Sequence, residues 1–304
     1  MHRADPAAMA ADILVVGDVM TDVIVRPHGP PVRGSDRAAT IREAPGGSGA
    51  NQAAWLGHLG VRVAFAGRVG AADAAAQAAG LRAHGVVPRL AADADLPTGI
   101  LVTLLDPDGE RSFLSDRAAN TALCAADLPA CLLDGARLLH VSGYSLFSEG
   151  PRAAVLALCA AAGQRGTPVT LDAASAGFLA EAGASAFLGW TTGVETLFAN
   201  ADEAAALTGE ADPACQLAAL SRHFSVVVLK RGADGAMALA RGGAAVAVAA
   251  PVVAAVDTTG AGDAFLAGFL AARLRGVELA GCLAAGAALG ARAATLLGGR
   301  PNQP

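Results

Sequence analysis

The sequence predicts a three-layer α/β fold, with a mostly parallel central sheet, helices on both of its faces and a small β lid. From position 138 onward, short apolar strands alternate with helical segments, which is typical of a parallel sheet covered on both faces. Two turn-rich hairpins, at 22–42 and 98–116, lie outside this alternation, and we expect them to form the lid. The length of 304 residues allows one large α/β domain, which we expect to span 1–304.

Short apolar runs bounded by turn residues predict the strands. Asp106-Pro107-Asp108-Gly109 predicts a tight turn in the second hairpin, because proline presets φ and glycine accepts a positive φ. This hairpin could pair with the first. A further apolar run, 246–256, is expected to lead as a strand into a glycine turn. The strands are expected at 12–16, 22–25, 37–42, 61–66, 86–87, 98–105, 111–115, 138–141, 168–171, 195–199, 226–229, 235–240 and 244–249.

Apolar residues at helical spacing predict the helices, including those in alanine-rich stretches. Gly60 and Gly209 are expected to end two of them. Asn200, followed by Glu203, has the pattern of a capping box, and capping alone would explain both residues. The helices are expected at 50–59, 72–84, 151–165, 202–207, 213–223, 261–274 and 279–296.

Charge and composition argue against several classes of partner. The formal net charge is −5 and no tract is basic, so we expect no nucleic acid partner. The apolar run at 13–16 is too short to span a membrane, so we expect no membrane association. The 5 cysteines are widely spaced and form no C-x-x-C pair, which is typical of reduced thiols in the cytoplasm.

Polar side chains follow several of the predicted strands, where ligands of parallel sheets usually bind. Lys230, the chain's single lysine, could bind phosphate at such a position or simply be solvated beyond the sheet. The polar residues at strand ends are Asp18, Ser142, Asp172, Asn200, Lys230 and Asp257.

Residues 257–265 form a glycine-rich turn that opens a helix. The free N–H groups of Gly260, Ala261 and Gly262 would lie at the positive end of the helix dipole and could bind an anion. If the turn only bound an anion, the carboxylate of Asp263 would repel that anion. The position of Asp263 is explained if its carboxylate takes a proton from a hydroxyl that attacks the bound phosphoryl group. The alternative is a plain glycine turn with an acidic first helical turn.

A second glycine-rich stretch, at 45–52, also opens a helix. Gly46 and Gly47 allow a ligand to approach the backbone closely, and Asn51 offers a donor and an acceptor to a hydroxylated ligand. An ordinary loop and cap would explain the same residues.

Together, these two stretches resemble the signature motifs of the ribokinase-like, or PfkB, carbohydrate kinase family. The first matches the GG-x-x-x-N motif and the second, Asp-Thr-Thr-Gly-Ala-Gly-Asp, matches D-T-x-G-A-G-D. Asn200 and Glu203 match the family's N-x-x-E motif, and 98–120 looks like its second lid segment. The resemblance implies ATP-dependent phosphotransfer, with Mg²⁺, to a hydroxyl of a small sugar or sugar derivative.

The resemblance also implies roles for individual residues. Asp263 would be the catalytic base, and Gly260, Ala261 and Gly262 would form the anion hole. Asp257, with carbonyls near Thr259 and in the segment after the last helix, would hold K⁺ beside that hole; we take Ala293 and Gly298 as the ligands from that segment. Without a cation, Asp257 would only cap the turn. Substrate hydroxyls would be held by Asp22, Gly46, Gly47 and Asn51, and ATP with its Mg²⁺ by Asn200, Glu203, Lys230 and Gly232.

The acceptor is left open by three departures from ribokinases proper. Met20, Ser48 and Gly143 stand where those enzymes carry or neighbour substrate-binding polar residues, which argues against ribose itself. The alternative acceptors are sugars, sugar acids and nucleosides. As a further partner, a second copy of the chain could form a homodimer through the lid. A non-catalytic sugar or nucleoside sensor would be expected to lack Asp263. No P-loop motif is present, and Phe265 breaks a Rossmann G-x-G-x-x-G pattern.

Overall fold

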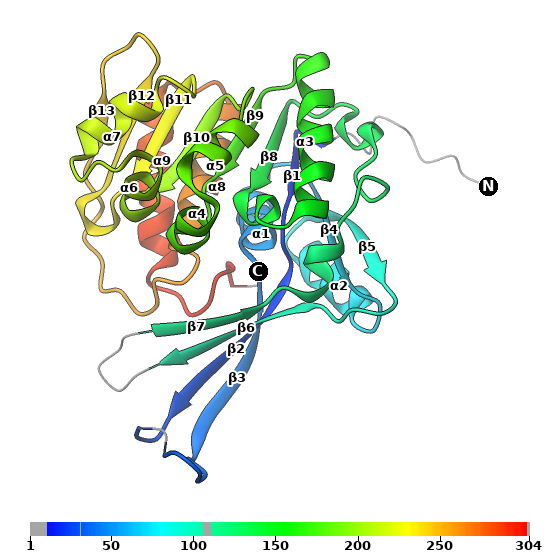
Figure 1. The fold of residues 1–304 in the computed structure, drawn as a ribbon. Coiled ribbons are helices and arrows are strands. Elements are labelled where there is room, and N and C mark those ends of the chain that lie inside the picture. Colours follow the sequence, from blue (N-terminus) through cyan, green and yellow to red (C-terminus); the bar gives the residue numbers. More distant parts are fainter. Residues whose placement is uncertain (1–10, 31, 106–110, 303–304) are drawn as a thin grey trace.

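The computed structural model describes residues 11–30, 32–105 and 111–302, arranged as two sheets with helices packed on the larger one (Figure 1). The large sheet has nine strands in the order β13-β12-β11-β10-β9-β8-β1-β4-β5. All of its strand pairs are parallel except the two that β12 forms with β11 and β13, so the predicted mostly parallel sheet is confirmed. Its strands are β1 (Ile13–Val16), β4 (Val63–Gly70), β5 (Val86–Asp93), β8 (Leu138–Ser142), β9 (Val169–Asp172), β10 (Thr196–Asn200), β11 (Val226–Lys230), β12 (Ala236–Ala240) and β13 (Val246–Val248).

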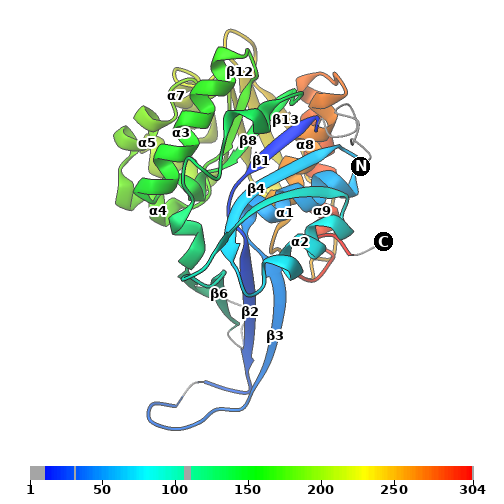
Figure 2. The ribbon, with the colours of Figure 1, turned by 90° about the vertical axis from the view of Figure 1, so that its right-hand side faces the viewer.

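Helices cover both faces of the large sheet, as predicted (Figures 1 and 2). One core contains Leu14 and Val16 of β1, and the other contains Ile13 and Val15, because successive side chains of a strand point to opposite faces. The first face carries α3 (Glu149–Gln164), α4 (Ala176–Ala182), α5 (Ala184–Trp190), α6 (Ala201–Thr208) and α7 (Pro213–Leu220). The second carries α1 (Ser48–His58), α2 (Ala74–Ala83), α8 (Ala261–Leu274) and α9 (Leu279–Ala293).

The second, small sheet has the strand order β3-β2-β6-β7 and projects away from the large sheet (Figures 1 and 2). Its strands are β2 (Met20–Pro27), β3 (Ala39–Gly46), β6 (Gly99–Leu105) and β7 (Arg111–Asp116). The two predicted hairpins do pair, through a parallel contact between β2 and β6. The predicted turn at Asp106-Pro107-Asp108-Gly109 lies outside the described residues.

Three predictions of secondary structure were wrong or incomplete. The expected strand at 246–256 ends at Val248, because the chain then leaves the sheet edge and crosses toward α8 with Val252 fully exposed. The helices α4 and α5 were not predicted, and β5 extends to Asp93 instead of ending at 87. Short 3₁₀ helices lie at Ala118–Ala122, Ala130–Leu133, Gly143–Leu146 and Gly232–Asp234. Within the described residues, no helix combines the length and the apolar character that a membrane crossing requires.

Candidate active site

The N-termini of α1 and α8 meet beyond the carboxyl ends of the central strands. The turn before α8 contains Gly260 in a left-handed conformation, with φ of 72°. A Cβ atom at Gly260 would lie 2.5 Å from the Cα atom of Gly299, in the segment after α9. Only glycine therefore fits this turn, and the close packing brings three segments that are distant in sequence to one place.

The carboxylate of Asp263 is held by donors from α1. Ser48 Oγ donates to Asp263 Oδ1 over 2.7 Å, Gln52 Nε2 donates to the same oxygen over 3.0 Å, and Asn51 Nδ2 donates to Oδ2 over 3.3 Å. Burial raises the pKa of Asp263 to about 7, and the hydrogen bond from Ser48 opposes this shift. The two glycine-rich stretches of the sequence thus converge on a carboxylate that can exchange a proton near neutral pH.

A buried ion pair lies behind this carboxylate. Lys230 Nζ, at the end of β11, is 2.6 Å from Asp172 Oδ1 at the end of β9. Burial alone would lower the pKa of Lys230, but the nearby carboxylates of Asp172 and Glu203 raise it, so the amine stays charged. Lys230 is therefore a fixed positive charge at the end of the sheet.

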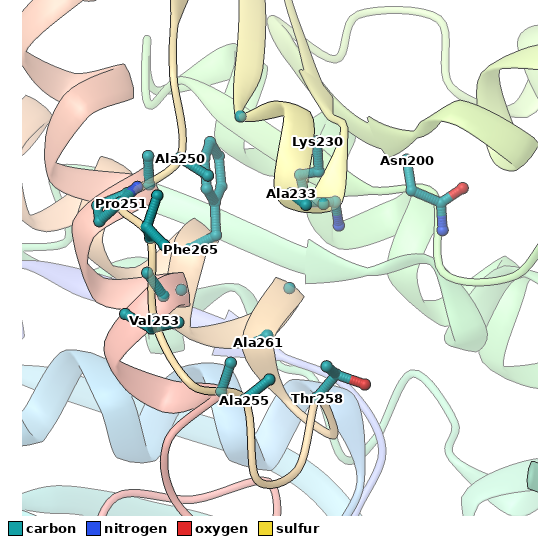
Figure 3. Close-up of a pocket in the computed structure, with 18 residues that line it drawn as sticks. Asn200, Lys230, Ala233, Ala250, Pro251, Val253, Ala255, Thr258, Ala261 and Phe265 are labelled. Atoms are coloured by element: carbon teal, nitrogen blue, oxygen red, sulfur yellow. The ribbon is translucent and has the colours of Figure 1, made fainter. Parts of the chain in front are cut away.

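A cavity of about 540 Å³ opens beside Lys230 and the first turn of α8 (Figure 3). Its polar end is formed by Lys230, Asn200 and Thr258, together with Ala261 and Gly262 of α8. Its other end is apolar. Figure 3 shows the side chains there grouped away from Lys230 and Asn200; they include Ala250, Pro251, Val253 and Phe265. The charged Lys230 with polar groups at one end and apolar walls at the other suit a nucleotide with its phosphates toward α8.

Asn200 and Glu203 form the complete capping box of α6. Asn200 N donates to Glu203 Oε2 over 2.8 Å, Asn200 Nδ2 donates to Oε1 over 2.7 Å, and Glu203 N donates to Asn200 Oδ1 over 2.8 Å. Burial raises the pKa of Glu203 to about 7, although Lys230 opposes the shift. The motif therefore caps α6, as the capping-box pattern predicted, and Asn200 also lines the cavity.

Asp22 lies near the start of β2, at the base of the small sheet. Its carboxylate packs against Gly46, where any Cβ atom would collide with it. Asp22 Oδ1 is buried without a hydrogen-bond partner among the described residues, and burial, with a contribution from Asp18, raises its pKa to about 6. A buried carboxylate oxygen without a partner is suited to accept a hydrogen bond from a ligand hydroxyl.

Gly47 joins this side of the site to α1 and needs its positive φ of 89°. The adjacent N–H groups of Ser48 and Gly49 donate to Asp18, and the Ser142 hydroxyl donates to the same carboxylate. Asp18 therefore serves to hold the first turn of α1 in place.

Asp257 connects the turn before α8 to the segment after α9. Its Oδ1 accepts from Thr259 N over 2.9 Å and its Oδ2 accepts from Gly298 N over 3.0 Å. The carbonyl of Ala293 accepts from Leu296 N over 2.9 Å. These bonds show Asp257 capping the turn before α8 and tying it to the segment after α9.

Three residues of the site were not predicted. Gln52 bridges Asp263 and Asp172, His140 contacts Gln52, and Arg300 donates to Asn51 Oδ1 over 3.1 Å and to the carbonyl of Gly46 over 2.9 Å. His140 lies within a predicted buried strand and Arg300 beyond the last helix, where no local pattern marks them. Gln52 follows Asn51 directly and is a polar residue in a buried stretch of α1. A polar side chain within an otherwise apolar helix was the signal that could have identified it.

Residues 10–304 match the pfkB family carbohydrate kinase. The chain is 29% identical over 296 residues to aminoimidazole riboside kinase from Salmonella typhimurium, covering 85% of this chain and 79% of that protein. It is 30% identical to fructokinase from Klebsiella pneumoniae, covering 86% and 84%. Ribokinase from Arabidopsis thaliana, solved with ribose and ATP, aligns with a TM-score of 0.79 at 26% identity, covering 97% and 96%. The resemblance of the glycine-rich motifs is confirmed, and the chain belongs to the pfkB family of carbohydrate kinases.

Proposed function

We propose that this chain transfers the γ-phosphoryl group of ATP to a hydroxyl of a small sugar or sugar derivative, with Asp263 as the general base. As a pfkB family member it is a phosphotransferase with an alcohol acceptor. The observation that carries the proposal is the position of Asp263. Its helix turn presents Ala261 and Gly262 to the cavity, while its carboxylate contacts Ser48 and Asn51 of α1.

In the proposed reaction, Asp263 accepts the proton of the acceptor hydroxyl as that oxygen attacks the γ-phosphorus. The bond from this phosphorus to the β,γ-bridging oxygen breaks, and ADP leaves. The N–H groups of Gly260 and Gly262 stabilise the negative charge on the transferred group, aided by the dipole of α8. The N–H of Ala261 donates to the Thr258 carbonyl over 3.2 Å and joins them only by exchanging that bond. Ser48 and Asn51 hold the carboxylate in position. Little covalent chemistry is required of the protein, since phosphoryl transfer depends mainly on positioning and charge stabilisation.

We assign ATP to the cavity, with its phosphates toward Lys230, Gly232 and the N-terminus of α8. Within the described part of the chain, no three His, Cys, Asp or Glu side chains are grouped to hold a metal. This fits Mg²⁺, which usually binds through substrate phosphates and water with one or two carboxylates. Asn200 and Glu203 would lie near that ion, which neutralises charge on the phosphates.

We assign the acceptor to the region between Asp263 and the small sheet. Asp22 Oδ1, the backbone at Gly46 and Gly47, and the amide of Asn51 would bind its hydroxyls. A nucleoside is the second candidate, because the relatives named above include a riboside kinase. A non-catalytic sensor is disfavoured because Asp263 and the glycine turn are both intact.

The test is ADP release from MgATP across a panel of sugars, keto-deoxy sugar acids and nucleosides. We expect one class to stimulate ADP release well above the rate without acceptor, and the Asp263→Asn variant to lose that stimulation. Equal background rates with every compound, in a folded protein that binds ATP, would contradict the kinase assignment. Preference for nucleosides over free sugars would select the second candidate.

A further inference from the structure

Gln52 and His140 are fully buried and hydrogen-bonded to one another behind the catalytic carboxylate. His140 Nε2 lies 3.0 Å from Gln52 Oε1, and its Nδ1 lies 2.9 Å from the hydroxyl of Thr170. Because an amide oxygen can only accept, Nε2 must carry the hydrogen, and Nδ1 then accepts from Thr170. Burial lowers the pKa of His140 to about 3, so the ring is neutral throughout the working pH range.

The carboxylates around Gln52 decide which way its amide points. Its Nε2 faces Asp263 Oδ1 at 3.0 Å, Asp172 Oδ2 at 3.3 Å and Ser48 Oγ at 2.9 Å. An amide turned by 180° would place its oxygen against two carboxylates. His140 stabilises the observed orientation by donating its Nε2–H to Oε1.

We propose that Gln52 and His140 form a positioning pair for the transfer reaction, in which His140 orients the Gln52 amide and that amide holds Asp263 ionised and in place between α1 and β9. The inference rests on the proposed function, since it assigns a role to Gln52 through the base. Neither residue contacts the cavity or Asp22, so neither is a catalytic residue.

The charged groups around Asp263 explain why a neutral donor between Asp263 and Asp172 matters. Asp172 raises the pKa of Asp263, and Lys230, which is paired with Asp172, lowers it. Arg300, after α9, and Tyr144, beyond β8, are the other titratable groups whose charge is coupled to that of Asp263. Gln52 is the neutral group that donates to both carboxylates at once, and it separates them. Without its N–H groups, ionised Asp263 would have, among the described residues, only Ser48 and Asn51 as side-chain donors.

The sign of the effect follows from this arrangement. A hydrogen bond to a carboxylate stabilises its ionised form and lowers its pKa, so loss of the Gln52 donor raises the pKa of Asp263. A general base acts only when ionised. The acid limb of the activity profile must therefore move to higher pH when either member of the pair is removed.

The test measures Asp263 directly, without an acceptor. The side-chain carboxyl carbons of ¹³C-labelled aspartates are followed by NMR against pH, and the signal of Asp263 is identified by its loss in Asp263→Asn. Gln52→Met, an apolar replacement of similar length, should raise the midpoint by about one pH unit, the scale of a single charged hydrogen bond. His140→Phe, which releases the amide, should raise it by less.

The double variant is the decisive measurement. Because His140 acts only through Gln52, the shift in Gln52→Met with His140→Phe should equal that of Gln52→Met alone. Each single variant leaves one buried polar group without its partner, which lowers stability. The double variant removes both groups together, so it should fold more stably than the single variants. The acid limb of kcat/KM should move with the NMR midpoint when activity is measured with the acceptor found in the panel.

The control is Thr191→Val, which removes another buried hydroxyl, bonded within α5 to Phe187. It should leave the Asp263 midpoint unchanged. A folded Gln52→Met protein with the wild-type midpoint, or single shifts that add in the double variant, would overturn the positioning pair. Failure of the proposed function has a different signature, in which Asp263→Asn remains active while the NMR shifts occur as expected.

Discussion

Asp263 is half-buried, and within the described residues the hydrogen bonds to its carboxylate come from a single turn of α1. The donors are uncharged, so they hold the carboxylate without pairing it with a cation. Burial keeps the pKa of this carboxylate raised against the opposing effect of these donors, so it is available to take a proton near neutral pH.

Replacement of Asp263 by asparagine should lower kcat by at least about 10²-fold, the usual scale for removing a positioned base. The change preserves shape and removes the proton acceptor, so MgATP should still bind, as calorimetry can show. The matched control is Asp134→Asn, at an exposed carboxylate paired with Arg165. A kcat close to wild type in Asp263→Asn would mean that another group takes the proton.

We expect kcat/KM for the acceptor to rise with pH and to level off above about 7, the value to which burial raises the pKa of Asp263. The base is protonated and inactive below that pH and ionised above it. Initial rates at saturating MgATP and constant ionic strength, from about pH 5 to 9, would show this limb. An activity that does not fall toward pH 5 would mean that Asp263 keeps the pKa of an exposed aspartate.

At the scale of elements, the site depends on two contacts. The small sheet lies beside the turn that opens α1, and the segment after α9 holds the turn that opens α8. Only three residues separate β1 of the large sheet from β2 of the small sheet. Asp22 therefore lies close to Gly46 and the turn that opens α1. The turn before α8 is held by Asp257 against the segment after α9. Motion of either element would change the site without altering the large sheet.

We predict that the small sheet closes over the acceptor. A closed lid excludes water and limits wasteful ATP hydrolysis. Hydrogen exchange of β2, β3, β6 and β7 should slow when acceptor is added, while β8 and β9 in the large sheet serve as internal controls. Equal exchange with and without acceptor would count against closure.

We predict activation by a monovalent cation, with K⁺ more effective than Na⁺. A cation beside Asp257 would stiffen the turn at Gly260 and strengthen its field on the phosphate. The measurement compares kcat in K⁺, Na⁺ and a bulky organic cation at constant ionic strength. Asp257→Asn, which keeps one acceptor oxygen, should remove the difference among the three.

Equal rates in all three salts would leave Asp257 with the structural role that its two backbone hydrogen bonds already show. In that case Asp257→Asn should lower thermal stability without changing the response to salt.

At the scale of the whole molecule, the small sheet has two faces of different character. Pairing in register places Asp22, Thr103 and Phe113 on one face, which we call the acceptor face. The opposite, outer face carries Val23, Val25, Ile41, Val102 and Leu114. Ile41 is 62% exposed and Leu114 is 61% exposed, so this apolar face is uncovered in a single chain.

We predict that two chains pair through the outer face. Leu114→Asp would place a charge in that contact and should convert a dimer to a monomer, as light scattering after size exclusion can measure. Phe113→Asp is the matched control, because Phe113 is similarly exposed, at 57%, but points to the acceptor face. A wild-type protein that is monomeric at micromolar concentration would contradict the prediction.

The sequence by itself determined the fold class and the position of the two helix openings. Strand and helix alternation predicted the parallel sheet because local periodicity reflects which side chains face a core. The glycine-rich stretches before α1 and α8 predicted close backbone approach, and Gly260 shows it against Gly299. The polar residues at strand ends, including Asp172 and Lys230, do lie at one edge of the sheet, since parallel strands share that edge.

Only the tertiary structure decided how those residues are connected. Gln52 meets Asp263 across 211 positions and His140 across 88, and no local pattern records which helix packs against which strand. The run after Val248 has the composition of a strand, but its strand ends there and the following residues line the cavity instead. Secondary structure follows from neighbours in the chain, whereas the direction of an amide or the pairing of a strand edge depends on groups that only folding brings together.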